Sequence, residues 1–136
     1  MAALTAALIG CGGPSGPSNP EIYGTWRAVK VEYVAKSGGA RVDLIAAGGT
    51  VVLVLNQNMS GTYTYTRPGA QAEVRTFTWS RDGENITWEY QPGNDDNFTV
   101  SLTGGTLRFM INGGKPYDCD GDGTPELADW TLEFVR

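Results

Sequence analysis

The sequence predicts an all-β domain built as an eight-stranded antiparallel up-and-down barrel, and three observations support this prediction. The chain of 136 residues contains 19 glycines and no obvious helix-forming run. Threonine, valine, tyrosine and tryptophan recur in short bursts, a composition that favours strands. Turn signals separate these bursts at short intervals, which is typical of all-β sandwiches and barrels. The length suits one domain with one core.

An apolar, uncharged segment opens the chain. Residues 1–10 have the length and character of the core of an export signal. No Lys or Arg precedes this segment, although export signals normally begin with a positive charge, so we expect the true translation start to lie upstream. The sequence LIGC at 8–11 resembles the lipobox of bacterial lipoproteins, in which the signal is removed and the cysteine is acylated. The resemblance implies that Cys11 is lipidated and holds the protein on a membrane. The alternative is an apolar tail with an unrelated cysteine.

The segment after the apolar run is rich in glycine, proline and serine. Residues 11–20 are therefore expected to form a flexible tether to a domain at 21–136. The second cysteine of the chain is Cys119. If Cys11 is acylated, Cys119 remains a lone thiol, whereas the alternative is a disulfide between the two in an exported protein. Mass spectrometry of the mature protein distinguishes these two states.

Eight runs with strand character follow the tether. They are residues 25–35, 50–55, 62–67, 72–80, 85–90, 98–102, 106–111 and 130–135. The breaks between them hold the residues that tight hairpins need, at 58–61, 68–69, 82–83, 92–93 and 104–105. Short hairpins predict an up-and-down meander, and closure into a barrel removes the exposed edges. The Gly- and Ala-rich stretch at 36–49 is expected to cover one mouth of the barrel.

Apolar and polar residues alternate along four of these runs, at 85–90, 98–102, 106–111 and 130–135, whereas the run at 50–55 is apolar on both faces. Ile86, Trp88 and Tyr90, for example, share one face, with Thr87 and Glu89 on the other. The inferred inward faces carry large rings, at Trp88, Tyr90, Phe98, Phe109, Trp130 and Phe134. These rings either fill an eight-stranded barrel completely or leave a small apolar pocket, and the sequence favours neither outcome.

Arg75 shares a face with Phe77 and Trp79 in the fourth run. Arg75 is either a polar anchor inside the barrel or part of a face that points outward. We favour the outward position, because a buried arginine needs a partner.

Gly24-Thr25-Trp26 opens the first run. This Gly-x-Trp motif, together with eight ordered strands, resembles the lipocalins and the lipocalin-like lipoproteins of bacteria. The resemblance implies a calycin-type barrel in which Trp26 closes one end and Arg136 packs on its ring through a cation–π contact. It also implies a small apolar ligand, whose candidate contacts are Trp26, Trp88, Tyr90, Phe98, Phe109, Trp130 and Phe134.

The most specific motif is an acidic loop before the last run, DCDGDGTPELAD at 118–129. It resembles the twelve-residue calcium loop of EF-hands and dockerin-like repeats, with Gly123 at the sharp turn. The resemblance implies oxygen ligands at loop positions one, three, five, seven, nine and twelve, which are Asp118, Asp120, Asp122, Thr124 (through its carbonyl), Glu126 and Asp129.

Two features of this loop depart from the EF-hand pattern. Asp129 replaces the usual glutamate at position twelve, and Pro125 lacks the amide hydrogen that joins twin EF-hands. No helical pattern flanks the loop. We therefore expect a solitary structural calcium site between two strands, and magnesium is less favoured because it prefers fewer protein ligands. The alternative is a solvated acidic loop that binds no ion.

Composition excludes several classes of function. The chain has no histidine, which excludes histidine-based catalysis and histidine metal ligands. The net charge of −5 argues against nucleic acid as a partner. No phosphate loop, Gly-x-Ser-x-Gly elbow or zinc spacing occurs, so we expect no enzyme.

These observations lead to one interpretation and one alternative. We expect a lipid-anchored, extracytoplasmic lipocalin-like protein of the bacterial cell envelope that binds a small apolar molecule and carries a structural calcium ion. The alternative is a structural or protein-interaction module whose barrel is filled by side chains.

Overall fold

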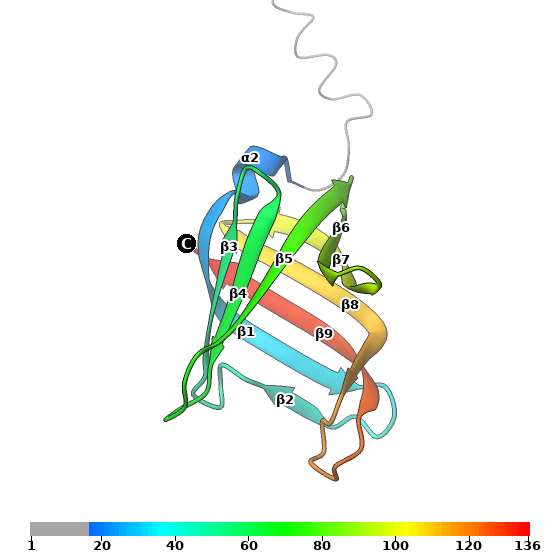
Figure 1. The fold of residues 1–136 in the computed structure, drawn as a ribbon. Helices are drawn as coiled ribbons and strands as arrows, with labels where there is room; N and C mark the ends of the chain where they lie inside the picture. The colour runs from blue at the N-terminus through cyan, green and yellow to red at the C-terminus, as the bar shows by residue number, and fades with distance from the viewer. Residues whose placement is uncertain (1–16) are drawn as a thin grey trace, which may run out of the picture.

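The chain folds into a single antiparallel sheet that curls into a barrel (Figure 1). The structure is a computed structural model, and it describes residues 17–136. A helical turn, α2, at Asn19–Ile22 precedes the sheet. The strands are β1 Gly24–Ala35, β2 Arg41–Asp43, β3 Thr50–Leu55, β4 Ser60–Thr66, β5 Glu73–Asp82, β6 Asn85–Gln91, β7 Asn94–Thr103, β8 Thr106–Tyr117 and β9 Glu126–Val135.

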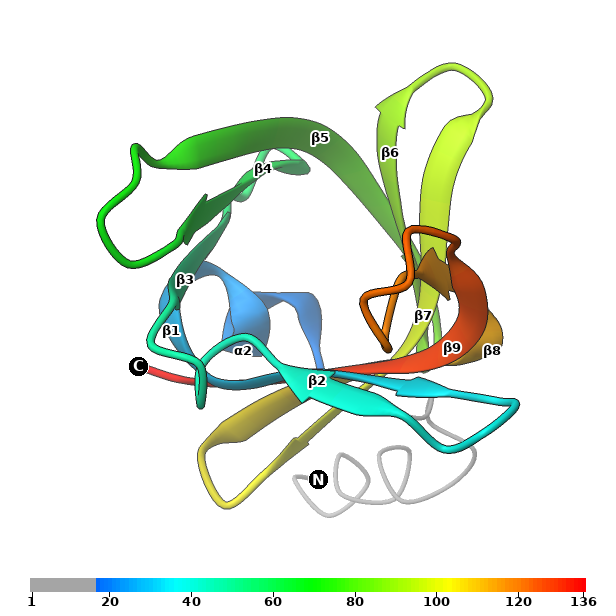
Figure 2. The ribbon, with the colours of Figure 1, turned by 90° about the horizontal axis from the view of Figure 1, so that it is seen from below.

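The first and last strands close the barrel. β1 pairs antiparallel with β9 from Arg27 opposite Val135 to Ala35 opposite Ala128. Strands β3 to β9 pair in sequence order, and the start of β1 pairs with β3. Eight strands therefore form the closed, up-and-down antiparallel barrel that the sequence predicted. Figure 2 looks along the barrel from the end that carries β2, with α2 at the far end.

β2 and α2 were not predicted. β2 pairs with the second half of β1, from Glu32 opposite Asp43 to Val34 opposite Arg41. Because β9 occupies one edge of β1 in this stretch, β2 takes the other edge, beyond the residues that pair with β3. A carboxylate oxygen of Asp43 accepts hydrogen bonds from the amides of Val31 and Ile45, which fixes the chain as it leaves β2.

β8 and β9 are longer than predicted. A register irregularity between Ile111 and Lys115 accommodates the Asn-Gly-Gly segment, and β8 then pairs with β9 as far as Tyr117 opposite Glu126. Gly113 has a φ of 70°, a left-handed conformation that a glycine adopts without strain. The sequence of this segment predicts the end of a strand, but in the structure the segment forms a bulge within one continuous strand.

Aromatic rings fill the middle of the barrel. Trp88 is fully buried, and its ring centroid lies 4.6 Å from that of Phe77, 4.5 Å from Phe98 and 5.1 Å from Phe109. The inward faces predicted from the sequence are confirmed at Trp88, Phe98 and Phe109. This part of the interior is a packed core.

The barrel end next to α2 is closed by Trp26. The ring is buried, and its Nε1 donates a hydrogen bond of 2.9 Å to the carbonyl of Ile22 in α2. The guanidinium of Arg136 lies 4.0 Å from the ring centroid and donates a hydrogen bond of 2.9 Å to the carbonyl of Tyr23. The expected cation–π contact between Arg136 and Trp26 is therefore confirmed.

Helices contribute little else to the described structure. Among residues 17–136, no helix has the length and apolar character needed to span a lipid bilayer.

Candidate functional site

A cavity of about 390 Å³ opens at the barrel end opposite α2. Its lining comes from the strand ends that meet at this mouth and from the segment between β2 and β3. The lining residues are Tyr33, Leu44, Tyr63, Tyr65, Arg67, Glu73, Arg75, Tyr90, Lys115, Pro116, Tyr117 and Trp130. Leu44 belongs to the 36–49 segment that was expected to cover a mouth, and it lines the wall of this cavity.

Half of the residues that line the cavity are aromatic. The Tyr33 ring stacks between two others, with centroid distances of 3.8 Å to Tyr117 and 5.4 Å to Trp130. Tyr63 meets Trp130 edge-on at 6.4 Å. These rings offer flat apolar faces beside polar edges.

Burial raises the pKa of the phenol groups of Tyr33, Tyr63 and Tyr90. The hydrogen bond that the Tyr90 hydroxyl donates to the Asp96 carboxylate raises the pKa of Tyr90 further, because it stabilises the protonated phenol. All three groups therefore remain protonated at neutral pH. Each is a hydroxyl that can donate a hydrogen bond.

Two ion pairs neutralise most of the charge around the cavity. The Lys115 ammonium lies 3.1 Å from each carboxylate oxygen of Asp96, which also accepts a 2.7 Å hydrogen bond from the Tyr90 hydroxyl. The same ammonium lies 4.5 Å from the centroid of the Trp130 ring. Arg67 pairs with Glu73 at the more exposed side of the mouth.

Arg75 also faces this cavity. Its guanidinium lies 4.3 Å from the centroid of the Tyr90 ring. Phe77 and Trp79, which share its strand face, are 4% and 3% exposed, so this face points into the barrel. The expectation that Arg75 points outward is therefore wrong. The inward face of β5 meets the packed core at Phe77 and Trp79 and the open cavity at Arg75. Arg75 therefore points inward and still contacts solvent at the mouth of the barrel.

The structure divides the seven candidate ligand residues between the cavity and the core. Tyr90 and Trp130 line the cavity. The other five are buried in the filled part of the barrel and do not line it, and they are Trp26, Trp88, Phe98, Phe109 and Phe134. The barrel thus combines the two outcomes that the sequence left open, with a filled middle and one hollow end.

Sequence reasoning missed several cavity residues. Tyr63 lies on an inward position of β4, and period-two alternation along that strand would have found it. Tyr33 also points inward, but an irregularity in β1 between Ala28 and Lys30 shifts the alternation counted from Trp26, so the sequence pattern did not place it there. Lys115 and Tyr117 gave no such signal, because the bulge in β8 interrupts the alternation before them.

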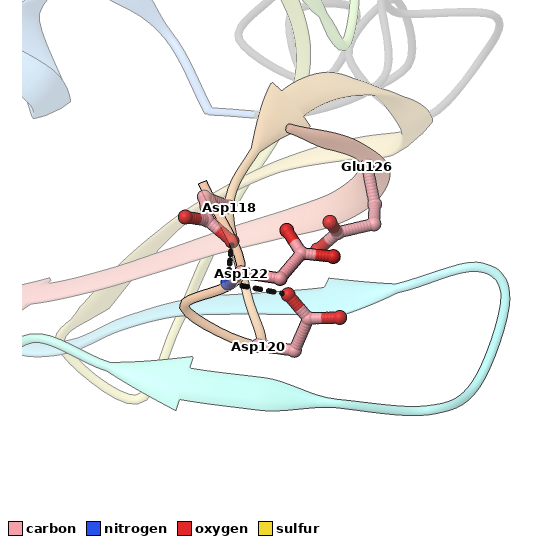
Figure 3. Close-up of side chains that lie close together, drawn as sticks. All are labelled: Asp118, Asp120, Asp122 and Glu126. Atoms are coloured by element: carbon pink, nitrogen blue, oxygen red, sulfur yellow. Dashed lines mark hydrogen bonds between the residues drawn. The ribbon is translucent and has the colours of Figure 1, made fainter. Parts of the chain in front are cut away.

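A second cluster lies on the hairpin between β8 and β9. The carboxylates of Asp118, Asp120, Asp122 and Glu126 each place one oxygen within 4.8 Å of the others (Figure 3). Two oxygens on opposite sides of a calcium ion, each about 2.4 Å from it, are about 4.8 Å apart. The spacing of the four carboxylates therefore fits one calcium ion.

Backbone amides hold these carboxylates in place. Asp118 accepts hydrogen bonds from the amides of Gly121, Asp122 and Gly123, at 2.9, 3.1 and 2.9 Å. The bond from Gly123 contributes most to lowering the pKa of the Asp118 carboxyl, because it favours the charged form. The Glu126 carboxylate accepts a 2.8 Å hydrogen bond from the amide of Cys119.

Thr124 and Asp129 lie at the end of this loop. The amide of Thr124 donates a 2.8 Å hydrogen bond to the Asp122 carboxylate. Asp129 lies in β9, and its carboxylate is 3.6 Å from the ammonium of Lys36. Because β9 begins at Glu126, residues 126 and 129 lie on opposite faces of an extended strand. The structure therefore brings four of the predicted metal ligands together and directs Asp129 elsewhere.

The structure describes Cys119 but not Cys11. Cys119 is a buried free thiol within the described residues, and burial raises its pKa. Cys11, the predicted site of lipidation, and the predicted signal at 1–10 lie outside the described residues.

The closed eight-stranded meander, with a tryptophan and an arginine at its sealed end, places the domain in the class of small, closed antiparallel barrels. The model of the Lipocalin-like domain family matches residues 22–109, which is more than half of the chain. The chain belongs to this family. No curated protein matches the chain. The acidic loop and four cavity residues, Lys115, Pro116, Tyr117 and Trp130, lie beyond the matched segment.

Proposed function

We propose that this lipocalin-like domain binds a small molecule with an apolar body in the cavity at its open mouth. The observation that carries the proposal is the cavity itself. Its volume of about 390 Å³ falls in the range of small-molecule sites, and the stacked rings of Tyr33, Tyr117 and Trp130 form part of its wall. We propose a non-catalytic role, since Lys115 and Tyr90 already engage the carboxylate of Asp96.

Binding of the neutral fluorescent probe phenylnaphthylamine to the full-length chain tests this proposal. We expect saturable binding at one probe per chain, and a probe at 100 times its dissociation constant should stabilise the fold by about 2.7 kcal/mol. Leu44→Trp introduces a larger ring into the cavity and should weaken binding about tenfold or more, because the probe and the ring compete for one space.

Val29→Trp is the matched control. Val29 is 47% exposed and does not line the cavity, so the same new ring should leave probe binding unchanged there. The wild-type chain failing to bind, or both variants binding like the wild type, would contradict the proposal. Either result would favour the alternative of a protein-interaction module.

We further propose that the acidic loop holds a structural calcium ion. Asp118, Asp120, Asp122 and Glu126 supply hard oxygen ligands at a suitable spacing, and calcium completes its shell of six to eight oxygens with carbonyls and water. An ion here would relieve the repulsion among four carboxylates and hold the β8–β9 hairpin in one arrangement.

Thermal and urea unfolding with and without calcium test this second proposal. Single extracellular modules bind calcium at about 10⁻⁴ to 10⁻³ M, so saturation at 100 times the dissociation constant should stabilise the wild type by about 2.7 kcal/mol. Asp118→Asn should abolish this gain, because it removes a charge that three amides orient towards the cluster. Asp82→Asn, at the exposed β5–β6 turn, should keep it. A wild type indifferent to calcium would show that the loop binds no calcium ion.

We also propose that Cys11 carries the lipid that anchors the domain to the bacterial cell envelope. The lipobox-like sequence at 8–11 and the tether that follows it support this proposal. Acyl chains on Cys11 in the mature protein would support the anchor, and a disulfide with Cys119 would contradict it.

A further inference from the structure

The charges that line the cavity are unequal in number. Arg67, Arg75 and Lys115 contribute three cations. Glu73 pairs with Arg67, and Asp96 pairs with Lys115, so two carboxylates face three cations. Within residues 17–136, Arg75 forms no ion pair. The cavity therefore contains one guanidinium whose charge no neighbouring carboxylate neutralises.

The position of Arg75 fits the capture of an anionic group. Arg75 lies opposite Tyr63 in the β4–β5 register, and its guanidinium stacks on Tyr90 at 4.3 Å. The contact leaves the edge of the planar fork free to donate paired hydrogen bonds, the geometry that carboxylates and sulfonates accept. The ring beneath it also limits the number of conformations that the side chain must lose on binding.

Hydrogen-bond donors surround the same space. Tyr33 and Tyr63 line the cavity, and burial raises the pKa of both phenol groups, so each keeps a proton to donate. A donor-rich wall favours a ligand that brings acceptor oxygens.

Another part of the cavity wall is a flat stack of aromatic rings. Tyr117, Tyr33 and Trp130 lie nearly parallel, with interplanar angles of 6° and 8° between neighbours. Such a stack presents planar faces that suit an aromatic ring system better than a flexible alkyl chain.

We propose that the ligand of this cavity is an aromatic anion, a flat apolar body that carries a carboxylate or sulfonate group, and that Arg75 binds the anionic group. This inference rests on the proposed ligand-binding function and adds the chemical class of the ligand. A cationic ligand is disfavoured, because it would approach an unneutralised guanidinium.

Two probes that share one aromatic skeleton test the inference on the full-length chain. Anilinonaphthalene sulfonate carries the anionic group, and phenylnaphthylamine lacks it. Arg75→Gln should weaken binding of the sulfonate probe about tenfold or more, since a hydrogen bond to a charged group is lost. The same variant should leave the neutral probe within about twofold, which also shows that the cavity remains intact.

Arg108→Gln is the matched control. Arg108 lies in β8, pairs with Glu133 at 3.2 Å and does not line the cavity, so both probes should bind this variant like the wild type. Equal weakening of both probes by Arg75→Gln, or no weakening of either, would overturn the role of Arg75 while leaving the cavity as a binding site. Failure of the wild type to bind either probe would overturn the ligand-binding function as well.

Discussion

Replacing Trp88 with alanine should lower the free energy of unfolding by about 3–5 kcal/mol. Trp88 is fully buried at the centre of the filled part of the barrel, and three rings from β5, β7 and β8 pack against it at centroid distances of 4.5–5.1 Å. Truncation would leave a cavity that these rings cannot close, because each is held by its own strand. Urea unfolding followed by far-UV circular dichroism would measure the loss.

Trp88→Phe is the control for this prediction. The Nε1 of Trp88 is buried without a hydrogen-bond partner in the described chain, so phenylalanine removes no such bond and keeps most of the ring packing. We expect a loss of about 1–2 kcal/mol for this variant. Equal stability of the alanine variant and the wild type would mean that the middle of the barrel is not packed as described.

Replacing Trp26 with alanine should cost a similar amount, about 3–5 kcal/mol, by opening the sealed end of the barrel. The change removes a buried ring, its hydrogen bond to Ile22 and the contact with Arg136. The loss should be larger than the area of one ring implies, because α2 and the C-terminal residue both rest on this side chain. Thermal and urea unfolding would measure it.

A double-mutant cycle separates the cation–π contact from the rest of this loss. Arg136→Met keeps the apolar stem and removes the guanidinium, and we expect a coupling energy with Trp26→Ala of about 0.5–2 kcal/mol. A coupling near zero would show that the two side chains touch without stabilising each other.

The sequence predicted the barrel because its signals were local and repeated. Short bursts of strand-forming residues and the turn residues between them defined the eight runs, and alternation of apolar and polar residues supported four of them, at 85–90, 98–102, 106–111 and 130–135. β2 and α2 span three and four residues, too few for any periodicity to appear. The end of β8 was not predicted for a different reason. A Gly-Gly pair marks a bulge at 113–114 but a hairpin turn at 104–105, and the sequence does not distinguish the two.

The site was less predictable than the fold. Large rings on inward faces are equally suited to a core and to a cavity wall, and only their height along the barrel separates Trp88 from Trp130. The acidic loop illustrates a conflict between two patterns. In an EF-hand the calcium loop leads into a helix, and its spacing predicts that Asp129 lies beside the other carboxylates. In this chain the loop leads into β9, and residues 126 and 129 of an extended strand lie on opposite faces.

The hairpin of β8 and β9 belongs to both candidate sites. Tyr117 stacks in the cavity wall. The next residue, Asp118, accepts hydrogen bonds from the three backbone amides that order the acidic cluster. If both sites are occupied as proposed, an ion that fixes Asp118 also fixes the ring beside it, and a guest packed on that ring favours the ion-holding arrangement. Such coupling is reciprocal by thermodynamic necessity. The residence time of the bound ligand would then rise and fall with the calcium concentration of the surrounding medium.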